Sequence, residues 1–304
     1  MLEISNCIQD YINYQKSEKK SVDRTIKKYM IFINEMIEIM DIKSINDIDN
    51  LTYPNLRQFW LRKKEDEGLS PSSLNLRISA ARSFLGYLEA QRLIKENVAN
   101  KIKKFKCKPR EVEVDLDKIK KMIQLIDDDY YNNPCFKTAR DRYLLYMLLF
   151  VGARNEECRK LKLDSINIKG EFELIGKYNK SRFVCLPDKM IKMHFEYLTK
   201  WRSQVPDNSD YLFTSIHGNM LDKNVPLNLT KKYASLSEMG ENFHCHDLRH
   251  ICVTTLIESG VSVSEVSKIV GHSNTSVTEK NYFRLSDAKT KENINKNKLL
   301  EEVM

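Results

Sequence analysis

Apolar residues in the N-terminal third of the chain recur at spacings of three and four, which is the repeat of an amphipathic α-helix. The pattern predicts three helices with Ser21, Thr52 and Ser70 as N-caps, the last two with a proline in the first turn. The first helix extends to about Met40, and Gly68 ends the second. The other faces of the last two helices carry the basic residues Arg57, Arg62, Lys63, Lys64, Arg77 and Arg82. These features predict a small helical domain with a basic exterior.

The chain beyond this domain is predicted to be mostly helical. Asp115 or Asp117 can cap a helix that runs through Ile126. A strongly apolar helix follows over residues 137–151. The C-terminal part is helical again, with glycines as punctuation, and ends in a polar tail.

Three short β-prone stretches interrupt the helices, at residues 166–169, 171–175 and 182–186. Gly170 and the segment 176–181 separate them as turns. They predict a small three-stranded antiparallel sheet. The predicted fold class is therefore mainly α, of the α+β type, with two helical domains and one small sheet in the second.

The run from Lys101 to Arg110 contains six basic residues and a proline, has no helical period and repels itself. It is the predicted domain boundary. We expect a helical domain over residues 1–106, a basic linker over 107–112 and a second domain over 113–304.

Composition narrows the class of protein. The 304 residues are 41% hydrophobic and 30% charged, with 9 Gly and 7 Pro, which excludes collagen-like, low-complexity and wholly disordered chains. No apolar run approaches the roughly 18 residues of a membrane span, and the N-terminus does not resemble a secretion signal. The 7 cysteines are scattered without a CxxC motif and are expected to be reduced thiols. We therefore expect a cytoplasmic protein.

The net charge of +8 is distributed unevenly. Residues 1–110 hold 21 Lys/Arg against 14 Asp/Glu, whereas residues 111–304 hold 29 against 28. A clustered basic excess is the electrostatic footprint of a protein that binds a phosphate backbone, although a solvated lysine-rich linker gives the same charge.

The most informative short motif is His246-Asp-Leu-Arg249-His250, at the start of an apolar helical pattern. His246 and Arg249 are three residues apart, so they share a helix face and can address one anion together. Taken alone, the motif favours a capped helix start that bears surface basic groups over an anion site. A zinc site from His244, Cys245, His246, His250 and Cys252 is disfavoured, because ligands one and two residues apart on a helix point in different directions.

Six polar residues occur in short motifs spread along the C-terminal part. In chain order they are Arg154, Lys177, His246, Arg249, His272 and Tyr282. Their order, with the small sheet between the first two motifs and a glycine before the last histidine, resembles the active-site series of the tyrosine recombinases, the family of phage integrases and Xer-like proteins. The resemblance covers both parts of the chain: the N-terminal helices are similar to the core-binding domain of that family, and the rest to its catalytic domain.

The resemblance implies that Tyr282 is the nucleophile, that Arg154 and Arg249 grip the phosphate, and that His272 is a second phosphate contact. The step from His272 to Tyr282 is one residue longer than is common in the family. Physical chemistry makes these residue types suitable. Two planar guanidinium forks can stabilise the charge that grows on the nonbridging oxygens, and nearby cations favour the phenolate of a tyrosine.

The resemblance also implies roles in proton transfer. Lys177 is the implied general acid for the departing 5′ oxygen, with Lys180 in the same turn as its rival. His246 is the implied general base and hydrogen-bonding group, and Glu157 braces the site. A lysine on a flexible turn suits this role because its charged group is movable.

A site-specific DNA recombinase is the implied function: it cuts and rejoins strands through a 3′-phosphotyrosine intermediate during integration, excision or resolution, without metal, ATP or other cofactor. The implied partners are double-stranded DNA with paired sites, accessory DNA-bending or directionality proteins, and further copies of the chain. A tetramer would be held in part by an apolar plug in the C-terminal tail, formed by Leu299, Leu300, Val303 and Met304, although a frayed end fits the same residues.

DNA contacts are expected mainly from the basic linker and the third helix, through Arg77, Arg82, Lys101, Lys103, Lys104, Lys106, Lys108 and Arg110. An additional arm-site DNA-binding domain is expected to be absent. Two alternatives belong to other classes. A type IB topoisomerase-like enzyme shares the chemistry but relaxes DNA without pairing sites, and a non-catalytic DNA-binding regulator has no use for the tyrosine.

Overall fold

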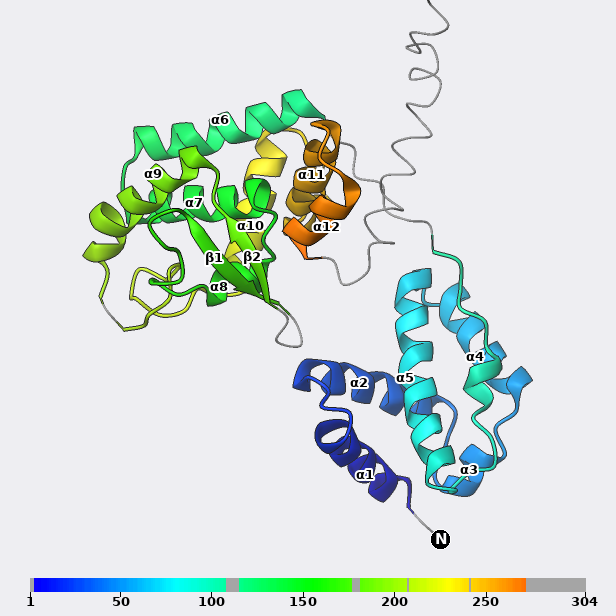
Figure 1. Cartoon of the computed structure of the whole chain (residues 1–304). Helices are drawn as coiled ribbons and strands as arrows, with labels where there is room; N and C mark the ends of the chain where they lie inside the picture. Colours follow the sequence, from blue (N-terminus) through cyan, green and yellow to red (C-terminus); the bar gives the residue numbers. More distant parts are fainter. Residues whose placement is uncertain (1–2, 108–114, 177–180, 207, 241, 272–304) are drawn as a thin grey trace, which may run out of the picture. The chain divides into compact units, whose positions relative to one another are not determined.

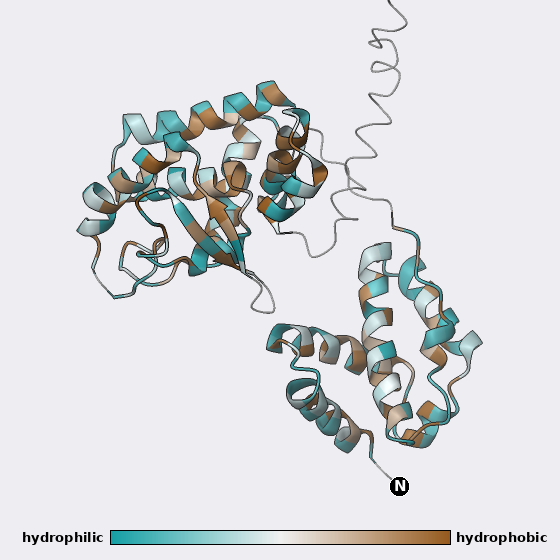
Figure 2. Ribbon diagram, in the orientation of Figure 1, coloured by the Kyte–Doolittle hydropathy of each residue, from teal (hydrophilic) through white to brown (hydrophobic). Residues whose placement is uncertain are grey.

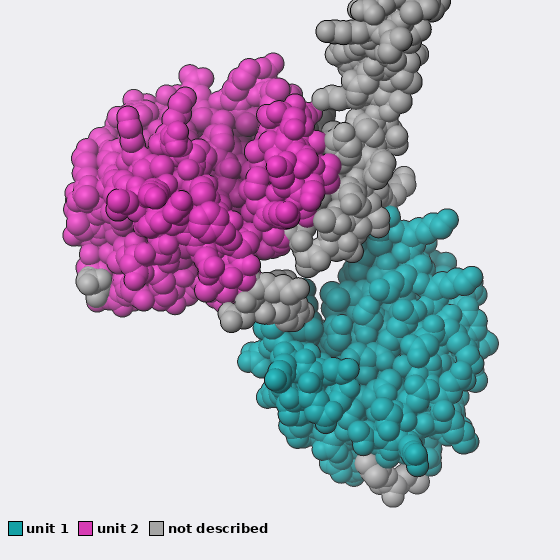
Figure 3. All heavy atoms as spheres, in the orientation of Figure 1, with its two compact units in different colours: residues 1–110 teal, residues 111–304 magenta. Residues whose placement is uncertain are grey.

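Two units divide the chain in the computed structural model, residues 1–110 and residues 111–304 (Figures 1 and 3). The structure describes residues 3–107, 115–176, 181–206, 208–240 and 242–271. Within these ranges, no helix is both long enough and apolar enough to cross a membrane.

The first unit is built around one long helix, α5. Its helical elements are α1 (Ile4–Ser17), α2 (Asp23–Ile39), α3 (Ile45–Asp49), α4 (Tyr53–Glu65), α5 (Pro71–Ala90) and a 3-10 turn (Val98–Lys101). Helix α5 packs against α1, α2, α4 and the 3-10 turn (Figure 1). Its buried side chains include Leu74, Ile78, Phe84 and Leu85, so the apolar stripe predicted for this helix forms the core of the unit.

Capping explains where two of these helices begin. The side chain of Thr52 accepts a hydrogen bond from the Asn55 amide, and that of Ser70 accepts one from the Ser73 amide, as predicted. The prediction for Ser21 is wrong, because α2 has Val22 as its N-cap residue. The Ser21 hydroxyl instead donates to Gln15 Oε1 at 2.7 Å, a contact with the preceding helix.

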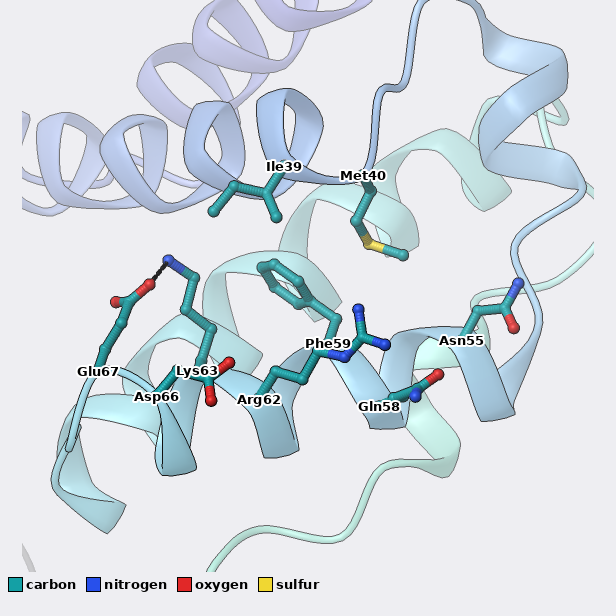
Figure 4. Close-up of a pocket in the computed structure, with 9 residues that line it drawn as sticks. All are labelled: Ile39, Met40, Asn55, Gln58, Phe59, Arg62, Lys63, Asp66 and Glu67. Carbon is teal, nitrogen blue, oxygen red and sulfur yellow. Dashed lines mark hydrogen bonds and ion pairs between the residues drawn. The ribbon is translucent and has the colours of Figure 1, made fainter.

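The predicted basic exterior of this unit is wrong for Lys63. Its side chain is only 7% exposed, and Nζ donates to Glu35 Oε1 at 2.7 Å and to a carboxylate oxygen of Glu67. Figure 4 shows Lys63 beside a cleft of about 330 Å³ that Ile39 and Phe59 also line. A buried ammonium group requires such carboxylate partners. Lys63 therefore forms ion pairs within the unit and is not part of its basic exterior.

The second unit is organised around α7, which contacts α6, α8, α9, α10 and α11. Its helices are α6 (Leu116–Asn132), α7 (Phe136–Phe150), α8 (Asn155–Lys160), α9 (Asp188–Glu196), α10 (Val225–Leu236), α11 (Cys245–Glu258) and α12 (Val263–Val270). A π turn (Tyr197–Trp201) and a 3-10 turn (Arg202–Gln204) follow α9.

Helix α6 shows how the apolar pattern sets the packing in this unit. Asp115 caps it by accepting hydrogen bonds from two amides, and the helix continues past the predicted end at Ile126. Its buried residues are spaced by three or four, and Figure 2 shows hydrophobic and hydrophilic positions alternating along it. The apolar side packs on α7 and α10.

The sheet of the described residues has two strands, not the predicted three. Strands β1 (Glu171–Ile175) and β2 (Ser181–Cys185) pair antiparallel, with Phe172 opposite Val184. The stretch 166–169 forms a turn, because the Asn167 side chain accepts hydrogen bonds from the amides of Lys169 and Glu171, both at 2.9 Å. The β-prone residues there predicted a strand, but the side-chain hydrogen bonds of the asparagine favour a turn.

A buried histidine makes the stability of the second unit pH-dependent. His194 is fully buried, its Nδ1 lies 3.0 Å from the Tyr143 hydroxyl, and burial lowers its pKa from 6.5 to about 4. Below pH 6.5 the unfolded chain therefore binds a proton that the folded protein does not. As the pH falls from 6.5 to about 4, we expect the free energy of unfolding to decrease by up to about 1.4 kcal/mol per pH unit.

Urea unfolding of the protein and of His194→Gln at pH 7, 6 and 5 measures this effect. Glutamine can still pair with Tyr143 but does not titrate, so the variant should lose less stability as the pH falls. Equal pH dependence in the two proteins would assign the acid sensitivity to other groups.

Candidate active site

Arg154 lies where α7 gives way to α8. The backbone turns at Gly152, which has a left-handed φ of +64°, and Arg154 then occupies the N-cap position of α8. A Cβ on Gly152 would lie 3.2 Å from both Cys252 Sγ and a methyl group of Val270, so the turn packs tightly on α11 and α12. Glycine is thus required both by the backbone conformation and by the space.

The Arg154 side chain is held from two sides. Nη1 donates to Glu157 Oε1 at 2.7 Å, and Nη2 donates to the backbone oxygen of Gly271 at 3.0 Å. The Arg154 amide also donates to Glu157 Oε2 at 2.7 Å, which completes the first turn of α8. With 34% of its side chain exposed, Arg154 is both fixed and accessible.

Glu157 has a second partner that the sequence analysis missed, Arg182 at the start of β2. Its Nη1 and Nη2 donate to the two Glu157 carboxylate oxygens at 2.7 and 2.8 Å. The Glu157 side chain is 2% exposed, and burial alone would raise its pKa; the hydrogen bonds from Arg182 and the Arg154 amide outweigh burial and lower the pKa to about 2. In the sequence, Arg182 is simply the first residue of a β-prone stretch, and no local pattern marks it as a residue of the site.

Arg249 lies on α11 and is almost completely buried, at 1% exposure. Its two terminal nitrogens donate to the backbone oxygens of Gly152 and Val270, and within the described part of the chain its Nε has no partner. Burial, followed by the nearby positive charges of Arg154 and Arg182, lowers the pKa of Arg249 to about 9. The site therefore concentrates positive charge in a poorly solvated place, which favours an anionic ligand.

His246 lies in the first turn of α11, three residues before Arg249. It is exposed, whereas Arg249 is buried. His244 is the N-cap residue of α11, and its amide donates to Asp247 Oδ2 at 2.6 Å. Each side chain of the predicted pair thus faces a different environment: His246 faces solvent, and Arg249 the interior.

Three predicted site residues, Lys177, His272 and Tyr282, lie outside the described residues. The described chain stops directly beside two of them. Gly176 follows β1, and Gly271, in a left-handed conformation with φ +65°, ends α12 immediately before His272. Because Gly271 O accepts a hydrogen bond from Arg154, the backbone before His272 is anchored at this arginine.

The two cysteines of the alternative zinc site make contacts with other groups. Cys245 Sγ lies 3.3 Å from Thr230 Oγ1, and Cys252 Sγ lies 3.6 Å from the Phe150 oxygen. Within the ranges that the structure describes, no group of three or more His, Cys, Asp or Glu residues could hold a metal ion.

The predicted DNA contacts of the first unit have several different environments. Arg77 donates to Glu35 and Ser73 and stacks on the Phe32 ring, and Arg82 donates to the backbone oxygens of Ala99 and Ile102. The exposed basic residues are Lys101, which pairs with Glu96, and Lys103, Lys104 and Lys106. Lys108 and Arg110 lie outside the described residues.

Comparisons with known proteins agree for both units. Residues 113–289 match the model of the "Phage integrase family", and residues 8–92 match "Phage integrase, N-terminal SAM-like domain". The tyrosine recombinase XerA of Pyrococcus horikoshii is 30% identical over 99% of this chain and 96% of its own length. The tyrosine recombinase XerC of Actinobacillus succinogenes is 27% identical over 91% of this chain and 92% of its own.

Solved structures show the same fold. The XerH site-specific recombinase bound to its difH substrate has a TM-score of 0.71 at 18% identity, covering 92% of this chain and 82% of that one. A lambda integrase dimer bound to a core site has a TM-score of 0.70 at 16% identity, covering 92% and 77%. Because the family model covers more than half of the chain, the protein belongs to the phage integrase family of tyrosine recombinases.

Proposed function

We propose that the protein is a site-specific DNA recombinase that cuts and rejoins duplex DNA through a covalent bond to Tyr282. The observation that carries the proposal is the convergence of Arg154 and Arg249 on one region of backbone. Arg249 donates to Gly152 and Val270, and Arg154, two residues after Gly152, donates to Gly271. Two guanidinium groups far apart in the sequence are thus anchored to adjoining carbonyl groups, as a clamp for one phosphate requires.

The proposed chemistry exchanges one phosphodiester bond for another. The Tyr282 oxygen attacks the phosphorus, an O–P bond forms, and the bond to the 5′ oxygen breaks. His246 accepts the phenol proton, and Lys177 protonates the leaving oxygen. Attack by a 5′ hydroxyl on the phosphotyrosine reverses the sequence, so rejoining requires no ATP.

Arginines supply the charge stabilisation in this proposal. Arg154 and Arg249 donate to the nonbridging oxygens, whose negative charge grows in the transition state, and His272 adds a further contact. Since Arg249 is only 1% exposed, the proposal requires the groups that cover it to move aside when DNA binds. The bound phosphate then takes the place of these covering groups and pairs with the charge of Arg249.

The proposed partners are duplex DNA carrying paired recombination sites, further copies of this chain, and accessory DNA-bending or directionality proteins. A related lambda integrase forms a tetramer on a Holliday junction, which supports assembly of this kind. We propose that the tail residues Leu299, Leu300, Val303 and Met304, which lie outside the described residues, bind a neighbouring subunit. A protein with this substrate would act in the cytoplasm, on the nucleoid.

The proposed domains are a core-binding domain over residues 1–106, a basic linker over 107–112 and a catalytic domain over 113–304. The division of the chain at residue 110 and the two family matches, 8–92 and 113–289, support this arrangement. The exposed lysines at 103, 104 and 106 are suited to contact the DNA backbone.

An assay with two recombination sites on one supercoiled plasmid tests the function, after the site has been identified from sequenced recombinant junctions. We expect exchange between the sites, in the presence of EDTA as in its absence, because the arginines provide the charge that a metal would otherwise supply. Relaxation of a plasmid without paired sites would favour the topoisomerase alternative. Binding without cleavage would favour the regulator, and activity that EDTA removes and a divalent ion restores would contradict the metal-free mechanism.

A further inference from the structure

Arg182 lies where β2, the start of α8 and the end of α12 meet. It stands at the start of β2, five positions after Lys177 in the sequence. Its Nη atoms bind Glu157, which also binds Arg154, and its Nε donates to the Ile269 oxygen at 3.0 Å near the end of α12. One side chain thus joins β2, the carboxylate that holds Arg154, and the helix that precedes His272.

The packing around this junction is tight. The Arg182 side chain is 9% exposed, and a Cβ on Gly271 would lie 2.5 Å from its Cδ atom. Arg182 is therefore too enclosed to serve as an open phosphate contact, and the bond to Ile269 fixes it against α12. Its contacts identify a role that acts through Glu157.

The charge balance shows what that role is. Glu157 alone would neutralise Arg154, because their ion pair at 2.7 Å contains one positive and one negative charge. Arg182 adds a second positive charge to the same carboxylate, also at 2.7 Å. The three side chains together are net positive, so Arg154 can be held rigidly by Glu157 without loss of the charge that the phosphate needs.

We propose that Arg182 is a positioning residue for DNA cleavage: it shares Glu157 with Arg154, keeps the phosphate clamp positively charged and ties the clamp to α12. This inference rests on the proposed function. It also predicts an effect on the binding of a plain anion, which does not depend on strand cleavage.

The variants that test it are Arg182→Ala, Glu157→Gln and the double variant with both changes. On a saturating nicked DNA substrate, Arg182→Ala should form the covalent adduct about 100-fold more slowly than the unaltered protein. Its affinity for DNA should change much less, because many other contacts hold the backbone. In the double variant, removal of the uncompensated carboxylate should restore the rate about tenfold over Arg182→Ala.

Rescue separates positioning from a merely structural role, because loss of two structural contacts should be worse than loss of one. Arg142→Gln is the matched control: this arginine makes a half-buried ion pair with Asp127 at 2.7 Å in the same unit, and the change should leave the cleavage rate unaltered. Thermal melting shows that each variant is folded, and Arg182→Lys, which keeps the charge without the fork, replaces the alanine if that variant does not fold.

Inorganic phosphate provides the second measurement, by NMR titration of the same proteins. We expect Arg182→Ala to bind phosphate about tenfold more weakly, with recovery in the double variant. Equal cleavage rates and equal phosphate affinities in the unaltered protein and Arg182→Ala, or a double variant worse than either single change, would overturn the inference. If the unaltered protein forms no adduct, the proposed function fails, and the phosphate titration alone decides for or against the role of Arg182.

Discussion

Replacing Arg249 by glutamine should lower the rate of DNA cleavage by about a thousandfold. Its guanidinium is buried, with its terminal nitrogens on the oxygens of Gly152 and Val270, so no other group can take its position when charge develops on the phosphate. Burial and neighbouring arginines already lower its pKa to about 9, which shows that the fold holds this charge against a cost. The measurement is the rate of covalent adduct formation on a nicked DNA substrate at saturating protein.

Folding of the Arg249→Gln variant should not be impaired, because the glutamine amide can still donate to a backbone oxygen and no buried charge is left unpaired. Arg249→Lys is the matched comparison. It keeps the charge but not the planar fork, so it should remain strongly impaired. A lysine variant with nearly full activity would show that charge alone suffices and that the two-carbonyl anchoring of the fork is unimportant.

Tyr282→Phe should eliminate the covalent adduct altogether. The change removes one oxygen atom, the proposed nucleophile, and leaves the ring, so DNA affinity in a gel-shift titration should stay within about twofold of the unaltered protein. The adduct is measured as a protein band that carries labelled DNA through denaturing electrophoresis.

A neighbouring aromatic provides the control for Tyr282. Phe283 is the next residue, and Phe283→Leu alters an adjacent side chain without removing a hydroxyl. Adduct formation that persists in Tyr282→Phe would assign the nucleophile to another tyrosine. Loss of DNA binding together with cleavage would instead indicate a structural role for the ring.

Much of the fold follows from local rules. The spacing of apolar residues and the caps at Thr52, Ser70 and Asp115 identify helices that the structure contains, because these signals act within a few residues. The turn at 166–169 was missed because one asparagine side chain outweighs a short apolar pattern. Ser21 was misassigned for a similar reason, since its hydroxyl prefers Gln15 of another helix.

In the candidate site, too, the sequence predicts residues that stand in local motifs but not the tertiary contacts that hold them. Arg154 and Arg249 stand in recognisable motifs, and the structure anchors both on adjoining backbone. Their partners could not be predicted, because a backbone oxygen such as that of Val270 or Gly271 has no sequence signature. The sequence does not reveal the buried ion pairs of Lys63 and Arg182, because their carboxylate partners are distant in the sequence and meet them only through tertiary packing. A basic residue on a helix or strand is more often exposed to solvent.

Mass spectrometry of the isolated protein–DNA adduct tests the account most directly. After digestion with trypsin and nuclease, we expect a nucleotide joined through its 3′ phosphate to the peptide that contains Tyr282. A nucleotide joined through its 5′ phosphate, or attached to a peptide from elsewhere in the chain, would contradict it.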